Sequence, residues 1–252
     1  MQRCLRLLKT LWLPSSLILL LAWVVWSLPS WEPWFRQWQP DVRNVVYTRD
    51  PFSYLLWQHL RLVAMATLGS LVLGLGGAIL VTRQWGRDFL PLVNQVASMG
   101  QTVPPVAVLA LAVPVLGFGN NATIVALLLY GLLPIVRNSI AGLNGVSPAV
   151  LEAARGMGLS ATQILWRVEL PLASRVILAG VRTTVTFGIA TAAIGSTVGA
   201  RTLGDPIIAG LVNGNNAYVL QGAILIGLLA ITLDAWFDAV AHWLPGETKQ
   251  AH

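Results

Sequence analysis

Long apolar runs separated by short polar connections extend along most of the chain. The hydrocarbon core of a bilayer is about 30 Å thick, and about 20 apolar residues cross it as a helix. Six stretches fit, covering residues 11–28, 60–82, 89–117, 123–140, 176–198 and 217–233. No stretch alternates with the period of a strand, which argues against a transmembrane barrel. The pattern predicts an all-α polytopic membrane protein with about six transmembrane helices.

Composition supports a membrane protein. Only 10% of the residues are charged, against roughly 25% in a soluble domain. The net charge of +6 does not indicate nucleic-acid binding, because the basic residues are scattered between apolar runs. Cys4 is the single cysteine, so the sequence offers no disulfide framework and no cysteine metal site.

The distribution of basic residues predicts the orientation. With the N-terminus in the cytoplasm, eleven of the 16 lysines and arginines lie on or near the cytoplasmic side. This bias predicts that both termini and the connection between the fourth and fifth spans are cytoplasmic. The first span also has the basic start of a signal peptide, but Leu28-Pro29-Ser30-Trp31 is a poor cleavage site. We therefore expect an uncleaved anchor.

The connection over residues 143–172 reads as a compact helix–turn–helix. Ser147 and Pro148 suit a helix start, and Gly156 and Gly158 end that helix near residue 157. The spacing of Ser160 and Gln163 predicts a capping box for a second short helix that ends before Pro171. Apolar residues at this density in a water-exposed segment suggest a binding face; they are Met157, Leu159, Ile164, Leu165 and Trp166.

Two spans carry features of a solute path. In the third, Gln101 and Thr102 precede Pro104 and Pro105, and such a break survives only inside protein or beside a watery cavity. We predict that Gln101 and Thr102 line the path. In the fifth, small residues that include Gly188 and Thr191 share a face, which fits either tight helix packing or a pore wall.

The loop carries a recognisable pattern. Glu152-Ala153-Ala154, then Gly158, then Leu170-Pro171 resembles the cytoplasmic loop of ABC-importer permeases. Over about residues 60–233 the chain is similar to permeases for glycine betaine and related osmoprotectants, of the bacterial Yeh/Opu kind. The segments that carry this likeness are residues 101–105, 114–119, 133–138, 152–158, 168–171, 179–183 and 202–206.

The resemblance implies a type I ABC importer permease fold and a transport subunit that catalyses nothing itself. It implies that residues of the loop seat a separate ATPase dimer; these are Glu152, Ala153, Ala154, Gly158, Leu159, Leu170 and Pro171. It further implies a second permease subunit, identical or related, a periplasmic or extracellular binding protein, and the bacterial inner membrane as location. No Walker A phosphate loop is present in the sequence, so we expect the partner to use ATP and this chain to bind no cofactor.

The resulting division has three parts: an anchor helix with an external loop (1–55), a permease domain (56–245) and a cytoplasmic tail (246–252).

One alternative function is a proton-coupled secondary transporter using Asp234 and Asp238, although their place near the cytoplasmic end beside His242 favours a solvated face. A permease for another small polar solute also fits. An intramembrane enzyme is not favoured, since we find no catalytic motif and no metal-ligand set. A channel subunit would not need the loop.

Overall fold

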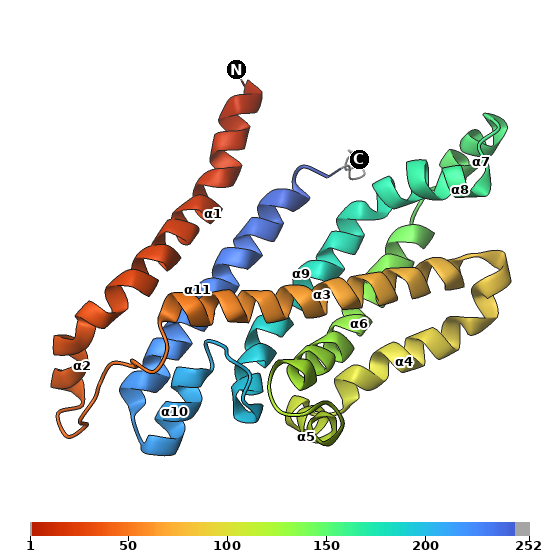
Figure 1. The fold of residues 1–252 in the computed structure, drawn as a ribbon. Helices are drawn as coiled ribbons and strands as arrows, with labels where there is room; N and C mark the ends of the chain where they lie inside the picture. The colour runs from red at the N-terminus through yellow and green to blue at the C-terminus, as the bar shows by residue number, and fades with distance from the viewer. Residues whose placement is uncertain (1, 245–252) are drawn as a thin grey trace.

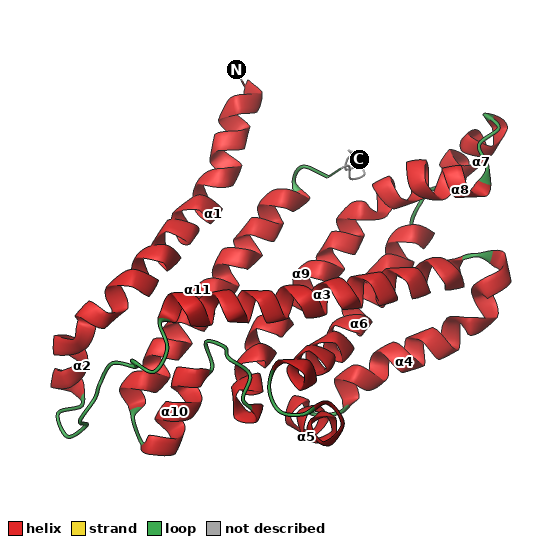
Figure 2. Ribbon diagram, in the orientation of Figure 1, coloured by secondary structure: helices red, strands yellow, loops and turns green. Residues whose placement is uncertain are grey.

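The computed structural model describes residues 2–244, with side chains from Leu11 onward, and this part of the chain is helical (Figure 2). The predicted tail, residues 246–252, lies outside the described residues. The longer helices are α1 (Gln2–Ser27), α3 (Phe52–Thr82), α4 (Leu90–Thr102), α5 (Pro105–Leu116), α6 (Asn120–Asn144), α9 (Leu170–Ile194) and α11 (Asn216–Ala241). The shorter ones are η1 (Leu28–Trp31), α2 (Glu32–Trp38), η2 (Gln84–Phe89), α7 (Pro148–Gly156), α8 (Ala161–Ile164), η3 (Leu165–Glu169), η4 (Gly195–Val198) and α10 (Asp205–Asn213).

The centre of the fold is the packing of α6 against α3 and α9, with α11 beside α9 and α1 at the edge against α11 (Figure 1). Small residues bring the central helices together. Gly180 of α9 faces the backbone of α6 at Pro134, and Gly195 faces Thr123. Such contacts suit a membrane interior, where close van der Waals packing rather than a hydrophobic driving force joins helices.

The two ends of the molecule are built differently. The start of α1, the end of α11 and the pair α7–α8 lie at one end, while α2, α5 and α10 lie at the other (Figure 1). The termini of the described chain and the predicted coupling loop therefore share one side, as the charge distribution predicts.

Five helical segments are long and apolar enough to cross a membrane, and a bent pair makes a sixth crossing if counted as one span. The bent pair replaces the single third span expected over 89–117. Its halves, Gln84–Thr102 and Pro105–Leu116, meet at 99°. The break falls at Pro104 and Pro105, where the first proline adopts an extended conformation and the second begins a new helix.

The second short helix of the loop does not end before Pro171, contrary to the sequence prediction. α8 continues through the π-helical turn η3 directly into α9, and Pro171 lies in the first turn of α9. A proline lacks the N–H that an α-helical ladder needs at this point. The π turn changes the hydrogen-bond spacing just before it, so the helix passes Pro171 without a break.

The candidate coupling loop and membrane path

The turn between α7 and α8 gives a physical reason for the spacing of the Glu-Ala-Ala-…-Gly pattern. The N–H of Leu159 donates to the carbonyl of Ala154 (3.2 Å), and that of Gly158 to the carbonyl of Arg155 (2.9 Å). Together with the positive φ of 79° at Gly158, these bonds form a Schellman motif. The motif requires a left-handed residue four positions after Ala154, and glycine adopts that conformation without a Cβ penalty.

Of the two caps predicted in the loop, one is present. Ser160 and Gln163 form the capping box: the Gln163 Oε1 accepts from the Ser160 N–H (2.8 Å), and the Ser160 Oγ accepts from the Gln163 N–H (3.4 Å). The predicted side-chain cap at Ser147 is wrong, because Ser147 makes no such hydrogen bond. Pro148 in the first turn already removes one of the free N–H groups that a cap would satisfy.

The exposed apolar face of the loop is narrower than the sequence predicts. Met157 and Trp166 project from it with 74% and 65% of their surface exposed. Ile164 instead is buried, and Leu159 and Leu165 are half-buried, so these residues do not belong to the exposed face. Exposed apolar side chains of this size on a polar segment are surface that a partner could cover.

The other predicted coupling residues surround this face. Glu152 and Ala153 lie exposed on α7, Ala154 is buried beneath them, and Leu170 and Pro171 begin α9. Glu152 lines a cavity of about 660 Å³ between the loop and the end of α3, together with Arg83, Arg155 and Glu169. The structure thus gathers the predicted coupling residues at one end of the molecule.

An ion pair between the half-buried Arg83 and the buried Glu169 links the loop to the end of α3, and no sequence pattern predicts it. Arg83 Nη1 lies 2.8 Å from Glu169 Oε2, and the Glu169 side chain is only 9% exposed. The approach lies outside hydrogen-bond geometry, and the Arg83 Nε is buried without a hydrogen-bond partner. The pair is therefore a single-point electrostatic contact.

The four predicted path residues lie at two separate places, two at the end of α4 and two on α9. Gln101 and Thr102 are exposed in the single chain at the end of α4, and the Gln101 Nε2 donates to the carbonyl of Tyr130 on α6 (3.0 Å). The Tyr130 hydroxyl donates in turn to the carbonyl of Val103, so α6 supports the backbone at the break. Gly188 and Thr191 are half-buried on α9, with Gly188 against Val63 of α3. Their role in the path stays a prediction.

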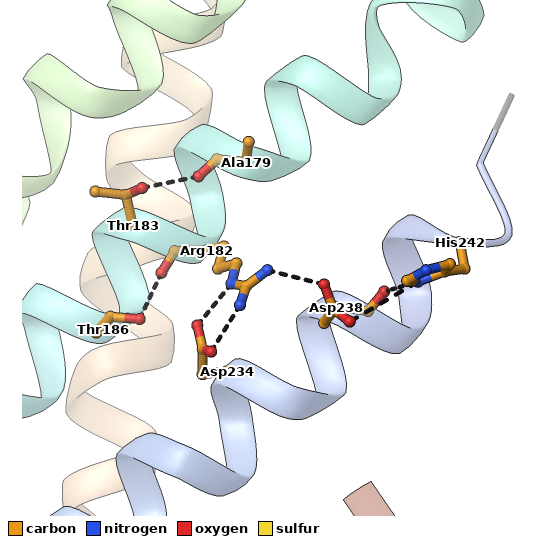
Figure 3. Close-up of polar contacts among 7 residues, drawn as sticks. All are labelled: Ala179, Arg182, Thr183, Thr186, Asp234, Asp238 and His242. Atoms are coloured by element: carbon orange, nitrogen blue, oxygen red, sulfur yellow. Dashed lines mark hydrogen bonds and ion pairs between the residues drawn. The ribbon is translucent and has the colours of Figure 1, made fainter. Parts of the chain in front are cut away.

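The sequence favours a solvated face for Asp234 and Asp238, but in the structure both carboxylates bind an arginine. Arg182 of α9 reaches across to both (Figure 3): its Nε and Nη2 each lie 2.6 Å from an oxygen of Asp234, and its Nη1 lies 3.2 Å from Asp238. His242 Nδ1 lies 3.9 Å from Asp238 Oδ2. The fork geometry of the guanidinium favours such bidentate pairing. The acids that a proton relay would use are thus engaged in joining α9 to α11.

His59 is a second group that sequence reasoning missed. It is fully buried on α3, with Nε2 3.1 Å from the carbonyl of Ile189 and Nδ1 accepting from the Leu203 N–H (3.3 Å). Since Nδ1 accepts, the proton of the neutral ring is on Nε2 and is donated to Ile189. His59 therefore joins α3, α9 and the connection that follows η4.

Polar contacts also fix the end of the molecule opposite the loop, which we call the distal cap (residues 39–51 and 199–221). Gln221 is buried; its Oε1 accepts from the Tyr47 N–H (3.0 Å) and its Nε2 donates to the carbonyl of Val45 (2.6 Å). Further bonds run from Asn215 to Asn44 and from Ala217 to Gln39. Burial raises the pKa of the Tyr47 phenol to about 12 and also raises that of the Asp205 carboxyl.

Comparison with known proteins identifies the class. Residues 70–244 match the family described as the binding-protein-dependent transport system inner membrane component. The chain belongs to this family, and it is a multi-pass membrane transport subunit rather than an enzyme.

Relatives of similar length support this assignment. The osmoprotectant import permease protein OsmY of Salmonella typhimurium is 35% identical over 224 residues, covering 88% of this chain and 90% of that protein. The glycine betaine/carnitine/choline permease OpuCD of Bacillus subtilis is 40% identical over 197 residues, covering 76% and 83%. The choline permease OpuBD of the same organism is 38% identical over 201 residues, covering 78% and 86%.

The fold agrees with that of solved importers. An inward-facing structure of the MetNI methionine ABC transporter matches with a TM-score of 0.68 and 21% identity, covering 79% of this chain and all of that one. An amino acid ABC transporter matches with a TM-score of 0.63 and 19% identity, covering 76% and 92%. The predicted ABC importer permease fold is confirmed, and the ATP-driven reading is supported over the proton-coupled one. Permeases of this class work with an ATPase and a substrate-binding protein.

Proposed function

We propose that this chain is the permease of an ATP-driven importer for a small osmoprotectant, of the glycine betaine, choline or carnitine type. The names of the relatives support this class of solute. The observation that carries the coupling role is the projecting loop (Figure 1), on which Met157, Trp166 and Glu152 are exposed. A soluble partner with a cleft for this loop would bury that apolar surface.

The same proposal places the loop and both termini in the cytoplasm. Residues 143–172 include Arg155 and Arg167, and the first span is preceded by Arg3, Arg6 and Lys9. Short connections rich in arginine and lysine stay on the cytoplasmic side. The distal cap then faces outward, where the binding protein would deliver the solute.

Solute selection is assigned to that binding protein. A quaternary ammonium is held by aromatic faces. Within the described spans, Tyr130 donates its hydroxyl to Val103, Tyr218 packs edge-on against Tyr47, and Phe187 lies exposed on α9. No aromatic pair is found among these three residues. Two permease subunits, identical or related, would face each other and enclose the path, each on one subunit of an ATPase dimer that binds and uses the ATP.

Reconstitution tests the proposed function. The chain, its ATPase and its binding protein are placed in liposomes, and uptake of radiolabelled glycine betaine, choline and carnitine is measured with and without ATP. We expect accumulation that needs ATP and the binding protein. Uptake driven by a proton gradient without ATP would overturn the proposal.

A matched pair of tryptophans tests the role of the loop. Trp166 and Trp12 are 65% and 66% exposed, but Trp12 lies on α1, away from the loop. We expect Trp166→Ala to reduce the ATPase that co-purifies with the permease by about tenfold, which corresponds to about 1.4 kcal/mol of contact energy. Trp12→Ala should leave the co-purified amount unchanged, and equal losses in both variants would contradict the assignment.

A further inference from the structure

The contact between Arg83 and Glu169 has a special place in the coupling loop. Among the described residues, it is the only side-chain polar contact that links residues 147–169 to another helix. The remaining polar side-chain bonds of this segment are internal, between Ser160 and Gln163. Apart from chain continuity and apolar packing, the loop is therefore held through Glu169.

Glu169 occupies the position where loop and membrane helix join. It is the last residue of the π turn η3, directly before Leu170 begins α9. A π turn inserted in a helix commonly marks a functional position, because it redirects the side chains that follow. Here the Glu169 carboxylate is buried and pairs with Arg83.

Arg83 lies in the turn that joins α3 to η2, which we call the elbow (residues 83–86). A displacement of Arg83 can be passed on through this turn. Arg83 ends α3 in an extended conformation, its N–H donates to Leu80, and its carbonyl accepts from the Gly86 N–H (3.1 Å). An added Cβ at Gly86 would lie 2.0 Å from the Leu80 carbonyl oxygen, so the elbow is closely packed. η2 leads from this elbow straight into α4, which ends at Gln101, Thr102 and the break.

The geometry of the Arg83–Glu169 pair indicates that it positions the loop against α3 and adds little to the free energy of unfolding. A buried pair pays a large desolvation penalty, which it recovers only with good geometry and further hydrogen bonds. This pair makes one contact between its two side chains, and the only further side-chain bond of Arg83 runs from Nη2 to the neighbouring Thr82 Oγ1 (3.3 Å). The Arg83 Nε and the Glu169 Oε2 are left without a hydrogen-bond partner. Two apolar residues would hold the same place at lower cost, whereas opposite charges fix which two elements meet.

We propose that Arg83 and Glu169 are positioning residues that tie the coupling loop to the elbow between α3 and η2. A displacement of the loop is then passed through the elbow to the broken span α4–α5. The same displacement also reaches α6 and α9, because the loop is continuous with both helices. This inference rests on the proposed function, since it concerns how ATP hydrolysis by the partner is converted into solute movement.

The complete transporter in liposomes tests the inference, with solute uptake and ATP hydrolysis measured in the same preparation. Arg83→Gln and Glu169→Gln should each lower the solute moved per ATP hydrolysed by about fivefold or more, the lower end of coupling between linked sites. The exchange Arg83→Glu with Glu169→Arg should restore the ratio. The control Asp234→Asn removes an ion pair between α9 and α11 and should leave the ratio unchanged.

A distance measurement gives a readout independent of activity. Spin labels are placed at the exposed Ala161 of the loop and Asp88 of η2, after Cys4→Ser removes the native thiol. In the otherwise native transporter the label distance should stay sharp and constant between nucleotide states. In Glu169→Gln it should broaden or change with nucleotide, and in the charge exchange it should sharpen again.

The outcomes separate the inference from the proposed function. If the unmodified transporter shows no ATP-dependent uptake, the proposed function fails. If it does, but the single variants keep both the uptake ratio and the label distance, the inference alone fails. If the single variants do not assemble, the charge exchange decides: restored assembly with a sharp distance supports the tie, and loss of assembly or a broadened distance overturns it.

Discussion

The distal cap and the coupling loop are attached to the same helices in opposite ways. In the cap, amide side chains of Gln221, Asn215 and Gln39 bind backbone groups far away in the sequence, and His59 of α3 accepts from the cap residue Leu203. In the loop, apart from apolar packing and the continuous chain at its two ends, a single ion pair makes the connection to the described helices around it. Long-range polar contacts therefore fix the cap more firmly than the loop.

This difference predicts that equivalent substitutions have unequal effects at the two ends. Buried hydrogen bonds that lose a partner cost the full desolvation of the group left behind. Exposed positions in the loop lose only local propensity or cap energy. Thermal unfolding of variants in detergent measures these effects, which we expect to decrease from Gly204→Ala through Gln221→Leu and Gly158→Ala to Asp234→Asn.

The largest effect is expected at Gly204 in the cap. A Cβ there would lie 2.1 Å from the carbonyl oxygen of Ala193, a backbone atom that cannot turn aside. We expect Gly204→Ala to destabilise the protein by about 3 kcal/mol or more, at the upper end of overpacking. The control Gly227→Ala on α11, where a Cβ meets nothing within 4 Å, should be neutral or slightly stabilising. An equally small effect at Gly204 would mean that the cap is loose.

Gln221→Leu should follow, with a loss of about 2 kcal/mol, because it leaves the Tyr47 N–H and the Val45 carbonyl buried without their partner. The matched change in the loop is Gln163→Leu, which removes half of an exposed capping box. We expect that variant to lose only about 0.5 kcal/mol. Equal losses would remove the contrast between cap and loop.

Gly158→Ala is expected to strain the backbone of the loop, although the added Cβ meets no neighbouring atom. Nothing lies within 4 Å of the added Cβ, but φ is 79°. A left-handed conformation costs a residue with a Cβ about 1 kcal/mol. The melting temperature should fall slightly while ATP-dependent uptake falls more, because Leu159 and Met157 are displaced in the loop. A larger loss of stability than in Gln221→Leu would contradict this order.

The smallest effect is expected for Asp234→Asn. The ion pair with Arg182 has good geometry, but its side chains are 35% and 44% exposed. We expect a loss below about 1 kcal/mol, reduced further by salt. A loss of several kcal/mol that salt does not change would instead place this pair in a dry interior.

Local patterns predicted much of this structure. The apolar runs gave the spans, the Gly158 turn and the Ser160–Gln163 box were readable from spacing, and Pro104–Pro105 marked the break. What the sequence could not supply were pairings between distant residues. Arg182 and Asp234 are 52 positions apart, His59 and Ile189 are 130 apart, and Tyr47 and Gln221 are 174 apart. Their contacts depend on how helices pack, which no local period encodes.

The passage of the helix through Pro171 shows another limit. A proline after a short amphipathic segment indicates a helix end, but the π turn over Leu165–Glu169 alters the hydrogen-bond pattern before it. The exposed or buried state of Ile164 likewise depended on how α7 folds over α8. The predicted helix–turn–helix of the loop is therefore confirmed, whereas the predicted end of its second helix before Pro171 is wrong.

The proposed coupling requires that the exposed surface of the loop at Trp166 contacts the ATPase. A photoreactive amino acid at position 166, in the assembled transporter in membrane vesicles, measures this directly. We predict a cross-link to the ATPase that disappears when the same group is placed at position 12. Cross-links only to lipid, or labelling of position 166 by an impermeant reagent from the outer side of the membrane, would contradict it.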